Sequence, residues 1–188
     1  ICGMMMVSKF GEYLLKNDKL AFINLDDPIQ IEKSKGIKNF TFSTKNETAD
    51  VVIHAIEANP MVTIAYHDLN INSNLIGIYN ATNSSAAIAI GTYFEVADAA
   101  IKNAIENYIP DNNRSQVFIK NGNKIILDAY NANPSSMAAA ITNFISLTAS
   151  TKFAVLGDMF ELGDESLIEH KNIISLLEKE TTITTFFV

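Results

Sequence analysis

Acids and amides gather at one turn of this sequence where a plain chain reversal would not need them. In the stretch KIILDAYNANPSSM, residues 124–137, an apolar run ends in Asp128, and Asn131 and Asn133 follow before a proline. Asparagine before proline is an ordinary helix start, because its side chain caps free amides and proline suits the first helical position. Capping explains Asn133, but it explains neither Asn131 nor Tyr130. The excess of polar groups indicates a ligand site.

A second apolar run, residues 152–156 (KFAVL), also leads into an acid, Asp158. Ligands of open α/β sheets bind beyond the carboxyl ends of the strands, so Asp128 and Asp158 are expected along one sheet edge. A lone acid in such a place more often caps a backbone amide. With two of them, the capping and the site interpretations stay equally open.

Residues 76–87 (IGIYNATNSSAA) hold another polar group of side chains. Asn80 and Asn83 are three residues apart, so they share one face if this stretch is helical. Tyr79 and Asn80 together could contact a flat ring such as a nucleobase, whereas Asn83 taken singly is more simply a helix cap. Arg114 is the only arginine. A surface role is the commoner one, but its place after a linker suits a grip on phosphate.

Composition narrows the class of protein. The 188 residues are 48% hydrophobic and 19% charged, which suits a soluble globular protein. One cysteine allows no internal disulfide and predicts a cytoplasmic location. A net charge of −7 without a basic cluster gives no sign of nucleic-acid binding. No apolar run is long enough for a membrane span. The first residue, Ile1, suggests a piece of a longer protein.

Several kinds of site are not indicated. Neither common glycine-rich phosphate loop is present. His54 and His67 have no neighbours at metal-ligand spacing, so no metal site is predicted. His170 is expected on a solvated helix face.

Hydrophobic periodicity predicts the elements of the first part as a parallel sheet continued by a meander. A helix end is expected over residues 12–17, and strands over residues 20–25, 39–43, 51–57 and 61–66, with a hairpin turn at 58–60. Residues 84–94 are apolar on nearly every side and predict a fully buried helix. A second helix is expected over residues 97–108.

The second part follows a linker at residues 109–113, where Pro110 stops a helix and polar residues follow. A hairpin is expected from residues 116–120 and 124–127 around Asn121 and Gly122. Beyond it, helices over 134–147 and 165–178 alternate with strands over 152–156 and 183–188. Strand and helix in alternation predict a parallel α/β sheet with right-handed crossovers.

These stretches together resemble the Mur ligase family of bacterial cell-wall synthesis. The resemblance rests on AFINLDDP (21–28), LIGIYNATNSSAAIAIG (75–91), NNRSQ (112–116), DAYNANPSSMAAAI (128–141) and LGDMFELGDES with a later histidine (156–166 and 170). It implies an α/β fold: the later half of the central ATPase domain, a mixed sheet plus helices, in residues 1–110. An incomplete Rossmann-like C-terminal ligase domain would follow in residues 111–188.

The resemblance also implies roles for single residues. Arg114 would be directed at phosphate and Asp128 would lie near the ribose, which makes these two the catalytic candidates. Tyr79 stands where the family usually has histidine. The expected nucleotide-binding residues are Asn80, Asn83, Arg114, Asp128, Asn131 and Asn133. Asp158 matches a motif position without an assigned duty.

The implied reaction is ATP-dependent peptide-bond formation through an acyl phosphate, with UDP-MurNAc-tripeptide and D-Ala-D-Ala as substrates. ATP and Mg²⁺ are expected, with the metal ligands outside these residues and the complete enzyme a monomer. Because the phosphate loop of the family is not in this sequence, the 188 residues alone are expected to be inactive. Two alternatives remain: another amide ligase such as a folylpolyglutamate synthetase, or a non-catalytic module that binds adenine nucleotide.

Overall fold

The computed structural model describes residues 10–58, 61–111 and 113–188. The chain divides into two compact units. The first holds Ile1–Glu57, Val62–Ser73 and Asn80–Tyr108, and the second holds Ala58–Met61, Asn74–Tyr79 and Ile109–Val188. From Ile109 onward the chain belongs only to the second unit, so this boundary lies at the segment expected as a linker. None of the described helices is long and apolar enough to cross a membrane.

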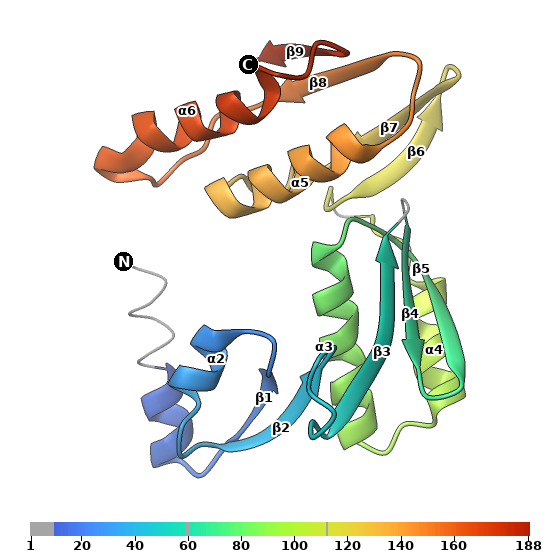
Figure 1. Cartoon of the computed structure of the whole chain (residues 1–188), viewed down its shortest axis with the longest axis vertical. Coiled ribbons are helices and arrows are strands. Elements are labelled where there is room, and N and C mark those ends of the chain that lie inside the picture. Colours follow the sequence, from blue (N-terminus) through green and yellow to red (C-terminus); the bar gives the residue numbers. More distant parts are fainter. Residues whose placement is uncertain (1–9, 59–60, 112) are drawn as a thin grey trace. The chain divides into compact units, whose positions relative to one another are not determined.

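A five-stranded sheet dominates the first unit. Its strands, in spatial order, are β1 (Leu20–Asn24), β2 (Lys38–Ser43), β3 (Val51–Ala58), β4 (Met61–Tyr66) and β5 (Leu69–Ile76). β1, β2 and β3 are parallel neighbours, and the arrows of β3 and β4 point in opposite directions (Figure 1). The predicted parallel start and meander are confirmed. The predicted turn at 58–60 lies mostly outside the described residues.

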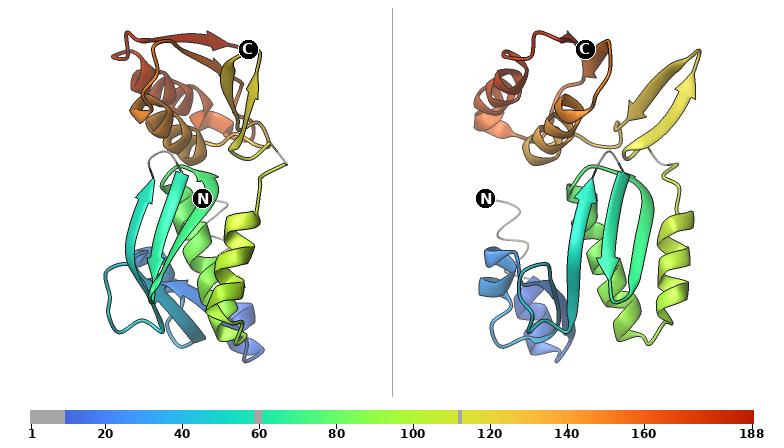
Figure 2. Two further views of the ribbon diagram at one scale, coloured as in Figure 1. Left: turned by 90° about the vertical axis from the view of Figure 1, so that its right-hand side faces the viewer. Right: turned by 45° about the vertical axis from the view of Figure 1, so that its right-hand side comes forward.

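Alternation along the strands builds the core of this sheet. Val62, Ile64 and Tyr66 of β4 are buried, and so are Ile71 and Ser73 of β5. The remaining helices of the unit are a helical stretch over residues 10–16, α2 (Pro28–Lys33), α3 (Tyr79–Tyr93) and α4 (Asp98–Asn107). In both views of Figure 2, α3 and α4 run beside the sheet.

α3 corrects one expectation from the sequence. It begins at Tyr79, five residues before the expected start at residue 84. Only one of its faces is buried, whereas Ile90 and Tyr93 are exposed. The buried face contacts the sheet through Tyr66, whose hydroxyl lies 2.9 Å from Thr92 Oγ1. Small residues on every side predicted burial all round, but one sheet face covers only one side of a helix.

The second unit combines a hairpin with an α/β segment. Its elements are β6 (Gln116–Lys120), β7 (Asn123–Leu127), α5 (Pro134–Ser146), β8 (Lys152–Leu156), η1 (Gly163–Glu165), α6 (Ser166–Leu177) and β9 (Ile183–Phe187). Asn121 and Gly122 turn the hairpin with φ values of 52° and 76°, as their type predicts. A core forms between α5 and α6 from Ile141, Ile173 and Leu177, joined by Met159.

The expected single parallel sheet is only partly present. β8 and β9 are parallel neighbours, whereas every residue of β7 pairs with β6 in a separate two-stranded sheet. Asp128 and Asp158 therefore follow strands of different sheets, and the prediction of a shared sheet edge is wrong. The order of strands and helices along the sequence does not determine which strands pair. The short turn at Asn121 brings β7 next to β6, and these two strands pair with each other.

Candidate functional site

Hydrogen bonds to Asp128 and Ala129 hold the backbone on both sides of Arg114. The amide of Ala129 donates to the carbonyl of Asn113 (2.8 Å), and the amide of Ser115 donates to Asp128 Oδ1 (3.0 Å). Asn113 and Ser115 have φ values of 58° and 52°, a left-handed conformation that costs a non-glycine residue roughly 1–2 kcal/mol. These contacts extend the β6–β7 pairing and fix the backbone on either side of Arg114.

The guanidinium of Arg114 lies on an aromatic ring. Its Cζ is 3.7 Å from the ring centroid of Tyr130, which is well within cation–π range. Tyr130 itself is 62% exposed. The aromatic residue that capping left unexplained therefore contacts the one arginine of the chain.

Tyr79 supports the same segment from another part of the second unit. Its hydroxyl is hydrogen-bonded to the hydroxyl of Ser115, which is only 3% exposed. Gly77, two residues earlier, has φ +88°, and a Cβ there would lie 2.6 Å from Cε1 of Tyr79. Glycine is thus required where the chain turns to place this tyrosine.

Asn80 and Asn83 lie near the start of α3, in the first unit. The side-chain amide of Asn83 donates to Asn80 Oδ1 over 3.2 Å, so the predicted shared face is confirmed. Asn80 is 8% exposed and Asn83 is exposed. Because α3 already begins at Tyr79, the alternative interpretation of Asn83 as its N-cap is wrong.

The two asparagines after Asp128 differ in their environments. Asn133 caps α5: its Oδ1 accepts from the amide of Ser136 (2.9 Å) and from the hydroxyl of Ser135 (2.8 Å). The capping interpretation of Asn133 is confirmed. Asn131 is exposed in the loop between Asp128 and α5, where its side chain faces solvent.

Asp158 and His170 form a pair that the sequence did not predict. His170 Nε2 lies 2.7 Å from Asp158 Oδ1, and its Nδ1 lies 2.7 Å from the carbonyl oxygen of Ser166. The hydrogen bond to Ser166, and then that to Asp158, raise the pKa of His170 above its ordinary value. Asp158 Oδ1 also accepts from the amide of Met159 (2.9 Å). His170 is therefore held in a pair that ties the loop after β8 to α6, and the expected solvated face is wrong.

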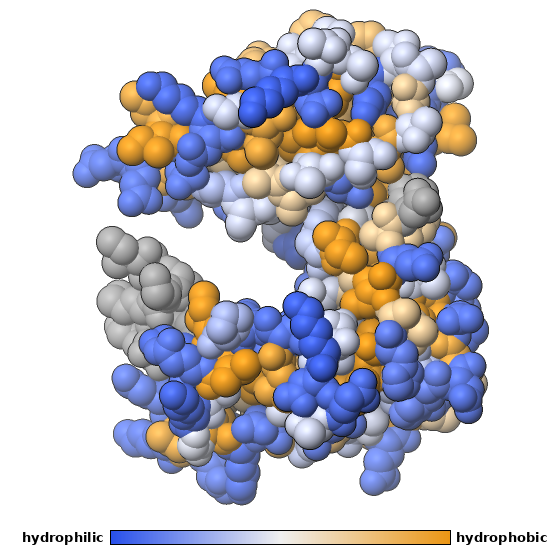
Figure 3. Space-filling view, viewed as in Figure 1, coloured by the Kyte–Doolittle hydropathy of each residue, from blue (hydrophilic) through white to orange (hydrophobic). Residues whose placement is uncertain are grey.

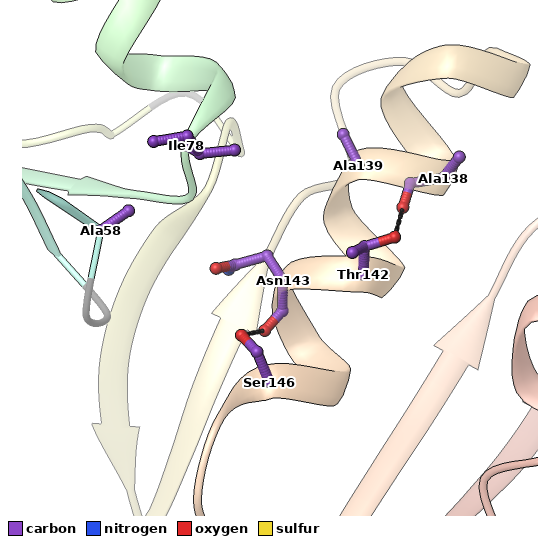
Figure 4. Close-up of a pocket in the computed structure, with 7 residues that line it drawn as sticks. All are labelled: Ala58, Ile78, Ala138, Ala139, Thr142, Asn143 and Ser146. Atoms are coloured by element: carbon purple, nitrogen blue, oxygen red, sulfur yellow. Dashed lines mark hydrogen bonds between the residues drawn. The ribbon is translucent and has the colours of Figure 1, made fainter. Parts of the chain in front are cut away.

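A pocket of about 370 Å³ lies elsewhere in the second unit (Figure 4). Small side chains line it: Ala58, Ile78, Ala138, Ala139, Thr142, Asn143 and Ser146. Thr142 and Ser146 donate their hydroxyls to carbonyls of their own helix, so the lining directs few polar groups inward. No predicted site residue is part of it. Within the described ranges, no group of three His, Cys, Asp or Glu side chains could hold a metal ion.

Comparison with known proteins identifies the family. The model of the Mur ligase middle domain matches residues 8–91, and that of the Mur ligase, glutamate ligase domain matches residues 113–187. The chain belongs to the Mur ligase family. Both segments that carry the predicted site residues, around α3 and around Arg114 and Asp128, lie within these matches.

Individual Mur ligases agree with this assignment. UDP-N-acetylmuramoyl-tripeptide–D-alanyl-D-alanine ligase of Bacillus subtilis is 33% identical over 160 residues, which cover 84% of this chain and 35% of that protein. The enzyme of the same name from Treponema pallidum is 35% identical over 113 residues, covering 60% of this chain and 24% of that protein. The chain thus spans only about a third, or less, of these relatives.

Solved Mur ligase structures share the fold. MurF from Acinetobacter baumannii superimposes with a TM-score of 0.76 at 24% identity, over 96% of this chain and 44% of that one. MurF from Thermotoga maritima, solved with ADP, gives 0.73 at 20% identity, over 91% of this chain and 40% of that one. The predicted mixed α/β fold of a Mur ligase is confirmed.

Sequence reasoning missed part of the surroundings of Arg114. Ser115, which joins Tyr79 to Asp128 through its hydroxyl and its amide, was not singled out, since a serine after an arginine has no pattern of its own. Tyr79 was interpreted as a candidate contact for a nucleobase and as a substitute for the histidine usual in Mur ligases, but not as a partner of Ser115. The turn glycine two residues before it was the available signal that this tyrosine has a fixed place.

Proposed function

We propose that this chain forms part of the ATP site of a ligase that joins D-Ala-D-Ala to UDP-MurNAc-tripeptide. The observation that carries the proposal is the fixed placement of Arg114 next to the Asp128 segment, held by the amides of Ser115 and Ala129. A cation and a carboxylate at the two hydrogen-bonded ends of one hairpin suit the phosphates and the ribose of a nucleotide. We infer the reaction from the names of the similar proteins.

The reaction proposed for the complete enzyme has two steps. The terminal carboxylate of UDP-MurNAc-tripeptide attacks the γ-phosphorus of ATP, and ADP leaves, which gives an acyl phosphate. The amine of D-Ala-D-Ala then attacks the acyl carbon, and inorganic phosphate leaves as the peptide bond forms. Transfer of a phosphoryl group depends mainly on positioning and on stabilising negative charge. Arg114 would supply positive charge to the phosphates.

The other residues would bind the nucleoside. Asp128 accepts one hydrogen bond from Ser115, and a carboxylate has about four acceptor positions, so it can also accept from the ribose hydroxyls. Asn80 and Asn83 would contact adenine and ribose, and Asn131 would contact the nucleotide together with Asn133. Mg²⁺ would neutralise phosphate charge, but the described residues form no group to hold it, and we assign it no step here.

We further propose residues 1–110 as part of the central ATP-binding domain and residues 111–188 as part of the C-terminal ligase domain. The ends of the two family matches, at residue 91 and from residue 113, support a boundary in this region. The complete enzyme would work in the cytoplasm as a monomer.

The deciding experiment assays the product of the complete reading frame around these residues. We expect ADP formation that requires both UDP-MurNAc-tripeptide and D-Ala-D-Ala, with kcat at least about tenfold lower in Asp128→Asn, because a lost charge-assisted hydrogen bond is worth about that factor. Asp164→Asn, in the short helix η1, is the matched control and should keep the activity. ADP formation that ignores D-Ala-D-Ala would contradict the proposal.

The 188-residue chain itself gives a second measurement. We expect no ligation by this chain, but weak binding of ATP in calorimetry that is reduced in Asp128→Asn and unchanged in Asp164→Asn. A start codon directly before Ile1 would favour the alternative, a non-catalytic module that binds adenine nucleotide. Ligation by the chain alone would contradict the expected inactivity.

A further inference from the structure

We propose that Tyr130 is a positioning residue for Arg114: its ring holds the guanidinium flat, with the N–H edge free to bind a phosphate group. The inference rests on the proposed function, in which Arg114 binds the phosphates of a nucleoside triphosphate. It adds a residue that neither the sequence patterns nor the family resemblance assigned.

The distance between the guanidinium and the ring determines their relative orientation. The Cζ atom of Arg114 lies 3.7 Å from the ring centroid of Tyr130. This equals the ordinary separation of carbon atoms in contact, about 3.5–4.0 Å. If an N–H pointed at the ring, a nitrogen would lie between Cζ and the ring, and Cζ would be farther away. The guanidinium is therefore stacked on the ring face.

Stacking leaves the donors of Arg114 available. The five N–H groups of a guanidinium lie in its plane and point outward, in the geometry that matches phosphate oxygens. The ring occupies one face of that plane and none of the edge. Arg114 and Tyr130 are both exposed, so a phosphate group in solution can reach this edge.

The backbone below the pair is fixed, although the side chains are exposed. Asn113 and Ser115, on either side of Arg114, are bonded to Ala129 and Asp128, the residues directly before Tyr130. Ser115 is buried and is also held by Tyr79. The two Cα atoms that carry the stacked groups therefore keep their separation.

The stack reduces the freedom that a phosphate would otherwise have to remove. A free arginine side chain populates many rotamers, and binding a ligand with it requires that most of them be given up. Contact with the ring restricts these rotamers before the ligand arrives, which increases affinity without adding a contact to the ligand. Because the ring face carries the effect, the phenol hydroxyl is not needed.

The single arginine makes this testable by NMR. The Nε–Hε group of Arg114 gives the only arginine side-chain signal of the chain, and a proton above an aromatic ring is shifted upfield. We expect such a shift in the wild-type chain and in Tyr130→Phe, and its loss in Tyr130→Leu. Tyr108→Leu, another exposed tyrosine, is the matched control and should leave the signal in place.

Titration with sodium triphosphate then measures the consequence. This probe carries the phosphate groups without adenine, so contacts of other residues with the base do not contribute. We expect the Arg114 signal to respond in the wild-type chain. The affinity should be about two- to fivefold lower in Tyr130→Leu, the loss expected for an exposed cation–π contact, and restored in Tyr130→Phe. Arg114→Lys should also bind more weakly, because an ammonium cannot stack flat.

The outcomes separate this inference from the proposed function. An unchanged upfield shift, or an unchanged triphosphate affinity, in Tyr130→Leu would overturn the positioning role. So would a wild-type Arg114 signal that does not respond to triphosphate. If Tyr130→Leu behaves as expected but the complete reading frame makes no ADP in response to D-Ala-D-Ala, the positioning role stands and the proposed ligase function fails.

Discussion

Gly77 has a backbone conformation that a side chain would strain, beside the tyrosine that contacts Ser115. We predict that Gly77→Ala lowers the free energy of unfolding by roughly 1–3 kcal/mol, the cost of a strained backbone residue. The added Cβ would lie 2.6 Å from the ring of Tyr79, so the ring must also move. Urea unfolding followed by circular dichroism measures the change. Gly157→Ala has open space and no positive φ, and its stability should match the wild type.

His170 predicts a dependence of stability on pH. Its pKa is raised in the folded chain by the carbonyl of Ser166 and by Asp158. A group whose pKa is higher in the folded state stabilises while it is protonated. This contribution is complete below the unfolded pKa, about 6.5, and is lost as the pH rises through the folded value.

We therefore expect unfolding midpoints in urea to fall as the pH rises above about 6.5, and to fall more steeply in the wild type than in His170→Gln. NMR titration of the imidazole gives the pKa directly. His67→Gln is the control, because His67 lies in the first unit with its own partner, Asp98. Equal slopes for the wild type and His170→Gln would show that the pair does not affect stability.

Among the elements, α5 depends on its first residue. Asn133 forms a capping box with Ser136. We predict that Asn133→Ala lowers the free energy of unfolding by about 1 kcal/mol, the usual cost of losing an N-cap. Asn133→Asp should retain the stability, since aspartate caps equally well. Asn131→Ala should change it by less than about 0.5 kcal/mol. A larger effect at Asn131 than at Asn133 would contradict the division of roles between them.

The other end of α5 is held by a lysine of β8. The Nζ atom of Lys152 lies 2.8 Å from the carbonyl oxygen of Ile145 and 3.1 Å from that of Leu147. Lys152 is only 9% exposed. A cation at the C-terminus of a helix satisfies its last carbonyls and opposes its dipole.

We predict that Lys152→Met destabilises the second unit by roughly 1–3 kcal/mol, the value of hydrogen bonds to a charged group. Methionine keeps the length of the side chain, so lost packing contributes little. Chemical unfolding measures the change, with Lys120→Met on the exposed strand β6 as the matched control. Equal stability of the two variants would mean that Lys152 does not stabilise the end of α5.

The sequence predicted elements best where chemistry was local. The turn at Asn121 and Gly122 and the Asn133–Pro134 helix start need only neighbouring residues, and both are confirmed. β5 was missed because asparagines occupy its solvent side, where they weaken the strand signal. α2 was not predicted, although the side chain of Asp27 caps it and Pro28 begins it. The single parallel sheet expected in the second part was the wrong strand pairing, because pairing across a helix depends on residues far apart in the chain.

For the site residues, too, local features were predicted and contacts between distant segments were not. Local patterns predicted Asn133 as a helix cap and the shared face of Asn80 and Asn83, but they did not predict that α3 begins before these two asparagines. The contacts of Arg114 with Tyr130, and of Ser115 with Tyr79, join segments distant in sequence. Only the folded chain brings these pairs together. The catalytic and binding roles themselves stay predictions.

Apolar side chains are exposed in both units, and several of them are visible on the face shown in Figure 3. One group is the outer face of the β8–β9 pair, where Phe153 stacks on Phe186 near the exposed Val155. Both faces of a parallel sheet are usually covered. We predict that the chain self-associates as its concentration rises and that Val155→Lys shifts it toward the monomer.

Analytical ultracentrifugation measures this association. Val96→Lys, at an exposed valine of the first unit, adds the same charge elsewhere and should leave the association unchanged. A wild-type chain that remains monomeric at high concentration would refute the prediction.

The lysine that holds the end of α5 also differs in reactivity from other lysines. An amine reacts with acylating reagents only when its nitrogen is accessible, and Nζ of Lys152 is enclosed by carbonyl groups and by Phe144. Its modification must wait until this end of the helix opens. The acetylation rate of Lys152, read by mass spectrometry, therefore reports local opening of the second unit under conditions in which the rest of the chain stays folded.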